Sequence, residues 1–482
     1  MKKIDYSALL LLAPILLVLY FGYVWQGYQL DDALIYLRYI KNVHEGHGLV
    51  YNPGERFNGL TSPFFTFVIL LTSFFYENLQ LLSVVISALF LLATAYFSAK
   101  LFARSRYGEL ITIILIVSFK YFYTTIGMET TLFLFLIVLS LYLYKINSDF
   151  FVITLALLVI TRSEGIFLAI PICIDYLIRY KKIPKLSYLV SGLVIVALPF
   201  IFNKWYYGDF LAVTGSAKIG QGKSGFWGYG QIFLQVNSLF VFFSNMRSIA
   251  YALLALAGLG LILLRNNRIA ILSLIFALLL LGFYGLLNIP NYHWYYAPFF
   301  LFSIIFASFA VEWLTLKCWQ AKGIAPKSLV ILALIIPMSF YFKNTMPWES
   351  NGRHESYAQI GMWLKANTPP NASVAMVEVG TVGWYADRHI IDILGLTNPY
   401  NAGYIAKGDA DSWPIHYQPD YILIHKPLWI HETIAKPLEE AGAYAAVASF
   451  NIPGYAMLHK TGKLADEEIA KMPAAYKASQ KK

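Results

Sequence analysis

Two adjacent carboxylates, Asp31 and Asp32, directly follow the first long apolar segment of the chain. Charged side chains at a membrane surface are costly unless they are solvated, cap a helix or carry out chemistry. A carboxylate at the mouth of a helical bundle could act as a general base that takes a proton from a hydroxyl group. The alternative is an N-cap for an interfacial helix over residues 33–43, but a cap occupies only one of the two aspartates. We therefore predict an acid/base site at this pair.

A third carboxylate, Glu129, stands between two apolar segments in the turn Gly127–Thr130. It is either solvated at the turn or a second acidic residue of the same site. Arg162 and Glu164 interrupt two apolar runs near the membrane. Because charges in a membrane usually find partners, an internal ion pair and a role in substrate binding both remain open for them.

A phosphate group that leaves a substrate needs cations, since charge-assisted contacts to phosphate are the strong ones. Lys218 lies in a glycine-rich stretch, residues 215–230, whose lysines and aromatics suit it to folding over a ligand. His293 could contact the phosphate, or it could stand in an interfacial aromatic belt. The candidate cations on the proposed face are Lys120, Arg162, Lys204, Lys218, Lys223 and Arg247.

The composition is typical of a polytopic membrane protein. Of the 482 residues, 58% are hydrophobic and only 13% are charged, and the mean hydropathy is +0.57, more than a water-soluble chain of this length would tolerate. The net charge of +10 does not indicate nucleic-acid binding, because the Lys and Arg residues fall in short loops rather than in one stripe. Cys173 and Cys318 lie far apart at apolar segments, so we predict no disulfide framework, no metal site and no cofactor.

Recurring apolar segments predict about eleven membrane-spanning helices, since a helix needs roughly 20 residues to cross the hydrocarbon. The first segment lacks a small-residue cleavage site and is expected to be retained. The stretch 62–76 is also apolar, but we expect it to lie in or dip into the outer surface. If it does not cross the membrane, the alternation of sides along the chain puts the basic loops on the cytoplasmic side. The predicted spans are 7–26, 79–103, 108–124, 130–145, 149–162, 165–180, 186–203, 246–264, 269–288, 297–316 and 328–343.

The same alternation of sides places the unusual polar residues and everything after residue 344 in one extracytoplasmic compartment. Alternating helix-like and strand-like stretches then predict a small α/β domain. The charged final residues lack an apolar period, so a frayed end is expected there. The predicted organisation is a transmembrane domain at 1–343, with a first extracytoplasmic loop at 27–78 and a flexible loop at 204–245, a small domain at 344–462 and a frayed tail at 463–482.

The first loop resembles that of GT-C glycosyltransferases. Its segment Asp31–Tyr39 reads Asp-Asp-Ala-x-Ile-Tyr-x-Arg-Tyr and is followed by Gly46–Arg56 and Gly59–Pro63. The pattern is most similar to that of mycobacterial-type arabinofuranosyltransferases that use decaprenyl-phosphate arabinose. Three further segments resemble motifs of this group: Gly127–Thr130, Thr161–Gly165 with Ser163 in place of a proline, and Tyr206–Lys218 with Ala212-Val213 in place of Pro-Asn.

The resemblance implies a GT-C fold and transfer of a sugar, such as arabinofuranose, from a polyprenyl-phosphate donor. It implies a hydroxyl acceptor (a glycan, a lipid or a surface protein such as a pilin) at the periplasmic face of the inner membrane, and no metal. Asp31 would be the base, supported by Asp32, with Glu129 near the acceptor. Arg162, Lys218 and His293 would hold the donor phosphate, and Arg38, Lys120, Glu164 and Tyr207 would contact substrate.

Two other classes of membrane protein remain open. A lipid-linked-sugar transporter would also be polytopic, but it would carry charged or helix-breaking residues near the midplane and some repeat symmetry, and neither is evident. A ligase or polymerase that moves whole glycans from a lipid carrier would share the surface carboxylates and cations. The Asp-Asp-Ala motif is the main feature that separates this second class from the glycosyltransferase.

Overall fold

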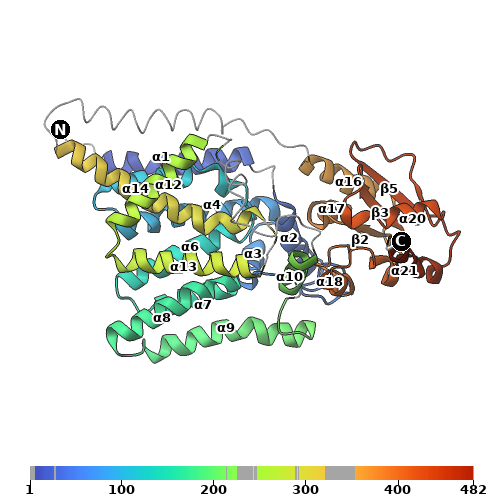
Figure 1. Ribbon diagram of the computed structural model, residues 1–482, viewed down its shortest axis with the longest axis horizontal. Helices are drawn as coiled ribbons and strands as arrows, with labels where there is room; N and C mark the ends of the chain where they lie inside the picture. The colour runs from blue at the N-terminus through green and yellow to red at the C-terminus, as the bar shows by residue number, and fades with distance from the viewer. Residues whose placement is uncertain are drawn as a thin grey trace.

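The computed structural model shows a helical bundle joined at one end to a small α/β domain (Figure 1). It describes residues 6–25, 29–212, 214–224, 243, 247–287, 290, 292–320 and 353–480. The apolar runs form helices because each is long, little interrupted by charge and bounded by loop residues. The bundle consists of α1 (Tyr6–Trp25), α4 (Leu79–Phe102), α5 (Arg106–Val117), α6 (Thr130–Lys145), α7 (Phe151–Thr161), α8 (Ile166–Tyr180), α9 (Leu186–Tyr207), α12 (Arg247–Leu263), α13 (Arg268–Leu286) and α14 (Ala297–Gln320).

These helices correspond to ten of the predicted spans, and the eleventh, 328–343, lies outside the described residues. Polar side chains set several of their ends. Asn78 and Asn267 accept hydrogen bonds from first-turn amides of α4 and α13, and Ser105 does the same for α5. In the described part of the chain, four helices are long and apolar enough to cross a membrane: α4, α9, α13 and the helix that continues from His293 to Gln320.

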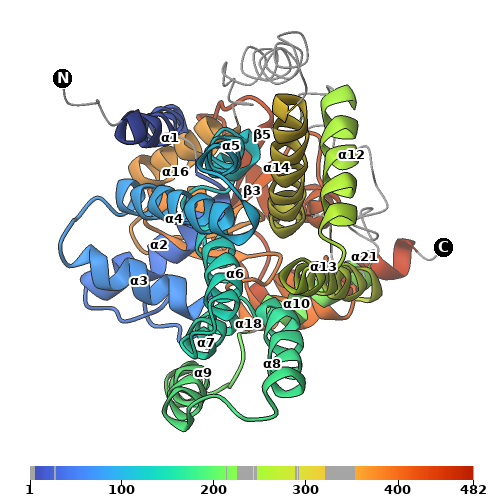
Figure 2. The ribbon, with the colours of Figure 1, turned by 90° about the vertical axis from the view of Figure 1, so that its left-hand side faces the viewer.

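The outer helices carry the apolar surface that contact with lipid requires. In α9, Gly192 is the only buried residue, while Leu193 and Ile201 are 71% and 62% exposed. Figure 2 shows α9 at the edge of the bundle and α6 near its centre. A long, exposed helix of this kind, whose one charged residue, Lys204, lies in its last turn, is stable in hydrocarbon because its backbone hydrogen bonds are satisfied internally.

The basic loops gather at the end of the bundle that lies away from the α/β domain. Lys145 donates hydrogen bonds to the carbonyl oxygens of Lys100 and Leu101, both at 2.8 Å. Arg268 forms an ion pair with Asp175 at 2.6 Å. This geometry places the predicted cytoplasmic loops together, and the α/β domain lies at the opposite end (Figure 1).

Helices α2 (Asp31–His44) and α3 (Pro63–Ser73) lie at the end of the bundle next to the α/β domain (Figure 1). Most of α2 is buried, including every residue from Ala33 to Ile40, so the helix expected over residues 33–43 is covered by protein on most of its surface. In α3, Phe67 and Leu71 are exposed while Phe65 and Ile69 are buried. This one-sided apolar exposure suits a helix that lies in a membrane surface.

The α/β domain contains a five-stranded sheet in the order β2-β1-β3-β5-β4. The first three strands are parallel and β5 is antiparallel to both of its neighbours. The parallel strands are almost wholly buried, as expected for strands covered on both faces. The elements are α16 (Arg353–Asn367), β1 (Ser373–Met376), α17 (Val379–Ala386), β2 (His389–Asp392), α18 (Pro399–Ala406), α19 (Trp413–His416), β3 (Tyr421–His425), α20 (Ala435–Glu440), β4 (Tyr444–Ala446), β5 (Tyr455–Lys460) and α21 (Asp466–Gln480).

Two segments differ from the sequence-based expectation. Helix α21 occupies most of the tail that was expected to be frayed, because Ile469 and Pro473 are buried and Lys477 pairs with Asp409. Part of the predicted flexible loop is also helical, as α10 (Thr214–Ser224). Residues 225–242 of that loop, and the predicted domain boundary at 343/344, lie outside the described residues.

The α/β domain is attached to the bundle chiefly where α17 packs against α2. A Cβ atom on Gly380 would lie 1.7 Å from the carbonyl oxygen of Asp31, so the two helices approach as closely as glycine allows. The guanidinium of Arg38 donates to the carbonyl oxygens of Gly383 and Arg388, both at 2.6 Å. The first loop and the α/β domain therefore form one packed unit.

Candidate active site

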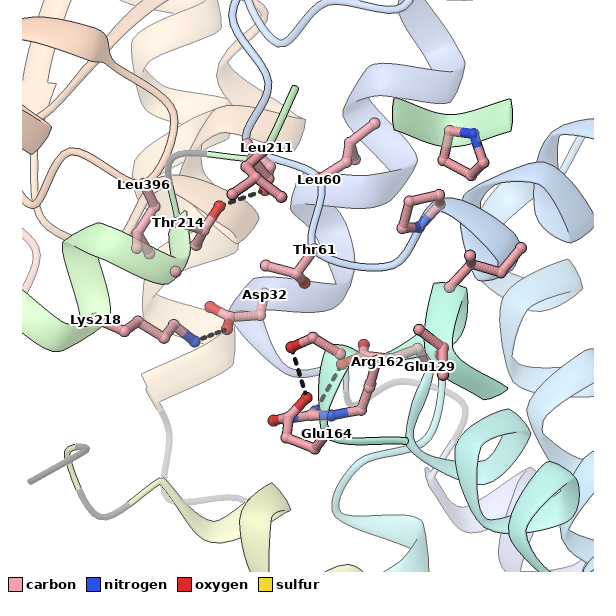
Figure 3. A pocket seen from close by; sticks show the side chains of 18 of the residues that line it. Asp32, Leu60, Thr61, Glu129, Arg162, Glu164, Leu211, Thr214, Lys218 and Leu396 are labelled. Carbon is pink, nitrogen blue, oxygen red and sulfur yellow. Dashed lines mark hydrogen bonds and ion pairs between the residues drawn. The ribbon is translucent and has the colours of Figure 1, made fainter. Parts of the chain in front are cut away.

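A cavity of about 860 Å³ opens where the bundle meets α2, α10 and the α/β domain. Charged side chains from separate parts of the chain line it, and Figure 3 shows five of them, Asp32, Glu129, Arg162, Glu164 and Lys218, gathered at one region of the opening. Apolar groups of α7, α9 and α13 line its other walls. The charged lining residues are Asp32, Glu129, Arg162, Glu164, Asp209 and Lys218.

Asp32 and Lys218 face each other at 3.9 Å between the ammonium nitrogen and a carboxylate oxygen. Both side chains are partly accessible, at 27% for Asp32 and 13% for Lys218. The Lys218 ammonium also lies 4.7 Å and 4.9 Å from the ring centroids of Tyr292 and Trp294. These aromatic faces attract the cation and fix its position without neutralising its charge. A carboxylate and a cation are thus available to a ligand on the same wall of the cavity.

Arg162 joins two carboxylates beside this pair. Its guanidinium donates to Glu129 at 2.9 Å and to Glu164 at 2.8 Å. Tyr284 donates a further hydrogen bond to Glu164 at 3.1 Å. The structure therefore contains the internal ion pair that the sequence left open, and it extends that pair to a triad.

Glu129 has one carboxylate oxygen that the described residues leave without a hydrogen bond. Its Oε1 accepts from Arg162, but its buried Oε2 has no hydrogen-bond partner in the part of the chain that the structure describes. An unsatisfied buried carboxylate oxygen costs free energy, so a hydroxyl group of a bound molecule would be favoured there. The side chain is 3% exposed and lines the cavity, which excludes the solvated turn as its setting.

Asp31 lies outside the cavity lining, although it directly precedes Asp32. Its carboxylate accepts hydrogen bonds from the backbone N–H groups of Gly380 at 2.7 Å and Thr381 at 2.6 Å. It therefore caps the N-terminus of α17 and not that of its own helix, which has Leu30 at the N-cap position. Burial raises the pKa of Asp31 to about 6 despite these two hydrogen bonds.

Four more of the sequence candidates also lie away from the cavity lining. Arg38 is buried and bonded to main-chain oxygens of the first loop and the α/β domain. The Tyr207 hydroxyl donates to the carbonyl oxygen of Leu49 at 2.7 Å. His293 and Lys120 belong to short 3₁₀ helices, and the carbonyl oxygen of His293 accepts a hydrogen bond from the Tyr121 hydroxyl. Arg38 and Tyr207 therefore join segments of the chain to one another, and none of the four residues is part of the cavity lining.

Several lining residues were not predicted. Trp294 and Tyr295 line the cavity, whereas the sequence analysis names their neighbour His293 in this aromatic stretch. Thr61 belongs to the quoted first-loop pattern, yet the pattern gave it no role. Leu396 comes from the α/β domain, and no signal in its own segment indicates that it reaches a cavity beside the membrane. Among the described residues, no group of three or more His, Cys, Asp or Glu side chains could hold a metal ion.

Comparisons with known proteins place this arrangement in a structural class. A family model described as a domain of unknown function, DUF8728, matches residues 345–474, which form most of the α/β domain. No curated protein matches the sequence.

Two solved structures of ArnT from Cupriavidus metallidurans are similar to the whole chain. The one bound to undecaprenyl phosphate has a TM-score of 0.62 at 12% identity and covers 96% of this chain and 99% of that one. The apo structure has a TM-score of 0.63 at 13% identity, covering 96% and 98%. The Archaeoglobus fulgidus oligosaccharyltransferase, tethered with an acceptor peptide, has a TM-score of 0.52 at 13% identity and covers 94% and 74%. At such low identity these likenesses establish the fold alone, and the chain has the GT-C fold.

Proposed function

We propose that this chain is a membrane glycosyltransferase that transfers a sugar from a polyprenyl-phosphate donor to a hydroxyl group. The observation that carries the proposal is the pairing of Asp32 with Lys218 in the wall of a cavity of about 860 Å³. A carboxylate that accepts a proton and a cation that binds a phosphate are the groups needed when a hydroxyl displaces a lipid phosphate.

In the proposed reaction, the oxygen of the acceptor hydroxyl attacks the anomeric carbon of the sugar, and its proton passes to the carboxylate of Asp32. The bond between the anomeric carbon and the phosphate oxygen breaks, and the polyprenyl phosphate leaves with the bonding electrons. Lys218 stabilises the negative charge that grows on this phosphate. The base role goes to Asp32 and not to Asp31, because Asp32 lines the cavity and Asp31 caps α17.

Glu129 and Arg162 have separate parts in this proposal. The Oε2 of Glu129, which has no hydrogen-bond partner among the described residues, accepts a hydroxyl of the bound sugar or acceptor. Arg162 already has two carboxylate partners, so it holds Glu129 and Glu164 in place and its contribution at the donor phosphate is secondary to that of Lys218. This assignment differs from the expectation that the two cations share the phosphate.

The cavity and the structural neighbours support a lipid-linked donor. Val159, Pro199 and Phe283 are among the residues that form apolar walls, which suit the first units of a polyprenyl chain. One neighbouring ArnT structure holds undecaprenyl phosphate, and the oligosaccharyltransferase structure holds an acceptor peptide. The first-loop motif favours arabinofuranose, with a cell-envelope glycan, a lipid or a surface protein such as a pilin as acceptor. The site would face the periplasm from the inner membrane.

The test is to incubate the purified protein in lipid nanodiscs with synthetic polyprenyl-phosphate pentoses and hexoses and a mixture of hydroxyl acceptors. Release of polyprenyl phosphate together with a glycosylated acceptor is the expected result. Asp32→Asn should slow release by roughly 10²-fold or more, while Glu77→Gln, a matched change at a carboxylate in the turn between α3 and α4, should leave it unchanged. Release that occurs only with lipid-linked oligosaccharides would make the protein a ligase or polymerase, and no release from any donor would refute the proposal.

A further inference from the structure

We infer that the C-terminal α/β domain is a structural part of the active site, and that it holds Asp32 and Lys218 at their separation through two positioning residues, Asp31 and Gly220. For its activity readout this inference rests on the proposed function. It gives a role to the segment that the family model describes only as a domain of unknown function.

Asp31 forms the first of the two attachments. Its carboxylate accepts the N–H groups of Gly380 and Thr381, which belong to the first turn of α17. A carboxylate at a helix N-terminus also interacts favourably with the helix dipole. Because Asp31 and Asp32 are consecutive in the first turn of α2, fixing the one fixes the backbone that carries the other.

Further contacts keep α17 in register with α2. The Tyr51 hydroxyl donates to the carbonyl oxygen of Val379 at 2.6 Å, directly beside the amides that Asp31 accepts. A Cβ atom on Gly383 would lie 2.2 Å from the Tyr51 hydroxyl. A residue larger than glycine therefore does not fit where α17 meets the first loop. The α/β domain therefore determines where the first turn of α2 lies.

The second attachment is the contact between α10 and α18. Gly220 of α10 lies against the backbone of α18, and a Cβ on it would be 2.3 Å from the Cα atom of Ala406. Lys218 is two residues earlier, about 200° around the helix, so it points away from α18 and into the cavity. The face of α10 that carries Gly220 thus rests on the α/β domain, while the opposite face presents the cation.

The domain also closes one side of the cavity. Leu396, which follows β2, is among the lining residues, and its carbonyl oxygen would lie 2.7 Å from a Cβ on Gly59 of the first loop. Figure 3 shows Leu396 beside Thr214 and Lys218 at the same side of the opening. Removing or displacing the domain would therefore open this wall as well as release both charged groups.

Four variants test the inference on the full-length protein. Asp31→Ala and Gly220→Ala each disturb one attachment, and Lys41→Ala and Gly403→Ala are their controls. Lys41 pairs with Asp387 across the same interface but near the far end of α2, and Gly403 of α18 has open space for a Cβ. Asp31→Asn and Tyr51→Phe are milder versions that retain part of the first attachment, and they serve if Asp31→Ala does not fold.

Two readouts are measured: sugar transfer, and hydrogen exchange at the amides of α10 and at Gly380 and Thr381. We expect kcat to fall about 10- to 100-fold in Asp31→Ala and Gly220→Ala, since a displacement near 1 Å can cost this much. Asp31→Asn should recover part of the loss, and both controls should stay within twofold of the wild type. Exchange should become faster at Gly380 and Thr381 in Asp31→Ala and along α10 in Gly220→Ala.

Unchanged exchange in both test variants, or unchanged kcat in folded Asp31→Ala and Gly220→Ala, would overturn the inference. If the wild type transfers no sugar from any donor, the proposed function fails and the exchange data alone decide whether the domain holds these helices. The two failures are therefore distinguishable.

Discussion

Asp31 and Asp32 are consecutive residues whose carboxylates serve different parts of the molecule. Asp31 accepts two backbone N–H groups of α17, and Asp32 lies 3.9 Å from the ammonium of Lys218 in the cavity wall. Both are in the first turn of one helix, where neighbouring side chains point about 100° apart. One residue can therefore anchor the α/β domain while the next faces a substrate.

The first prediction separates these two roles by isosteric substitution. Asp32→Asn retains the shape of the side chain but cannot accept a proton, so kcat should fall by roughly 10²-fold or more. Asp31→Asn should cost less, because the amide oxygen still accepts a hydrogen bond from α17. Initial rates of polyprenyl-phosphate release, measured at saturating donor, compare the two. Full activity in Asp32→Asn would move the base role to another carboxylate, with Glu129 the next to test.

The second prediction concerns the cation of the cavity. Lys218→Ala should raise the KM for the donor and lower kcat, because the leaving phosphate loses a charge-assisted contact. Lys218→Met keeps the length and the apolar contacts with the rings of Tyr292 and Trp294, so it isolates the charge. A donor titration with both variants measures the effect. Equal kinetics in Lys218→Met and the wild type would exclude Lys218 from phosphate binding.

The architecture could be predicted from the sequence because membrane helices depend on local properties. Apolar runs of sufficient length predicted helices within a few residues of their observed bounds in α4 and α6. The α/β domain was likewise predicted, from the alternation of helix-like and strand-like stretches after residue 344. Helix α21 was not predicted because its stability depends on tertiary packing, in which Ile469 and Pro473 are buried and the helix contacts α19 and α20.

The candidate site could be predicted only in part, for a related reason. Residue type, position between apolar segments and the resemblance to GT-C glycosyltransferases together indicated Asp32, Glu129, Arg162, Glu164 and Lys218, and the structure brings them to one cavity. The same criteria could not show that Asp31 and Arg38 bond to the α/β domain. Their partners lie some 350 positions away in the chain, and only the tertiary structure brings them together.

The third prediction concerns the Arg162 triad. Arg162→Ala leaves two buried carboxylates without their cation, which should lower the free energy of unfolding by about 3–5 kcal/mol. Arg268→Ala is the matched control, because its ion pair with Asp175 lies where the arginine side chain is 45% exposed and should contribute at most about 1 kcal/mol. Thermal unfolding in detergent compares them. A small shift for Arg162→Ala would mean that the carboxylates are protonated or solvated without it.

The fourth prediction is a pH dependence of the contact between the α/β domain and α2. Burial, together with neighbouring negative charge, raises the pKa of Asp31 to about 6 and that of Glu378 to about 8. Because both values are raised above those of the unfolded chain, these groups favour the folded state at low pH. Their contribution is lost as pH rises through about 6 and then about 8.

Thermal unfolding of the wild type and of Glu378→Gln between pH 5 and pH 9 tests this sign. The wild type should lose stability across the interval, and the variant should lose less, since it removes the group with the higher pKa and one charge beside Asp31. A wild type whose stability rises across the same interval would contradict the raised pKa values of Asp31 and Glu378, because carboxylates with lowered pKa values, such as Asp387 and Glu55, titrate below this interval and cannot produce the rise.

The last prediction fixes the orientation of the cavity in the membrane. Basic loops cluster at the end of the bundle that carries Lys145 and Arg268, and the α/β domain lies at the other end. Because cytoplasmic loops carry an excess of Lys and Arg, a reporter fused after Lys145 or Arg265 should be cytoplasmic. A reporter fused after Lys482 should be periplasmic, on the side of the cavity. Alkaline phosphatase and green fluorescent protein fusions at these three positions give opposite readouts. A cytoplasmic C-terminus would place the cavity on the cytoplasmic side and remove periplasmic transfer from the proposed function.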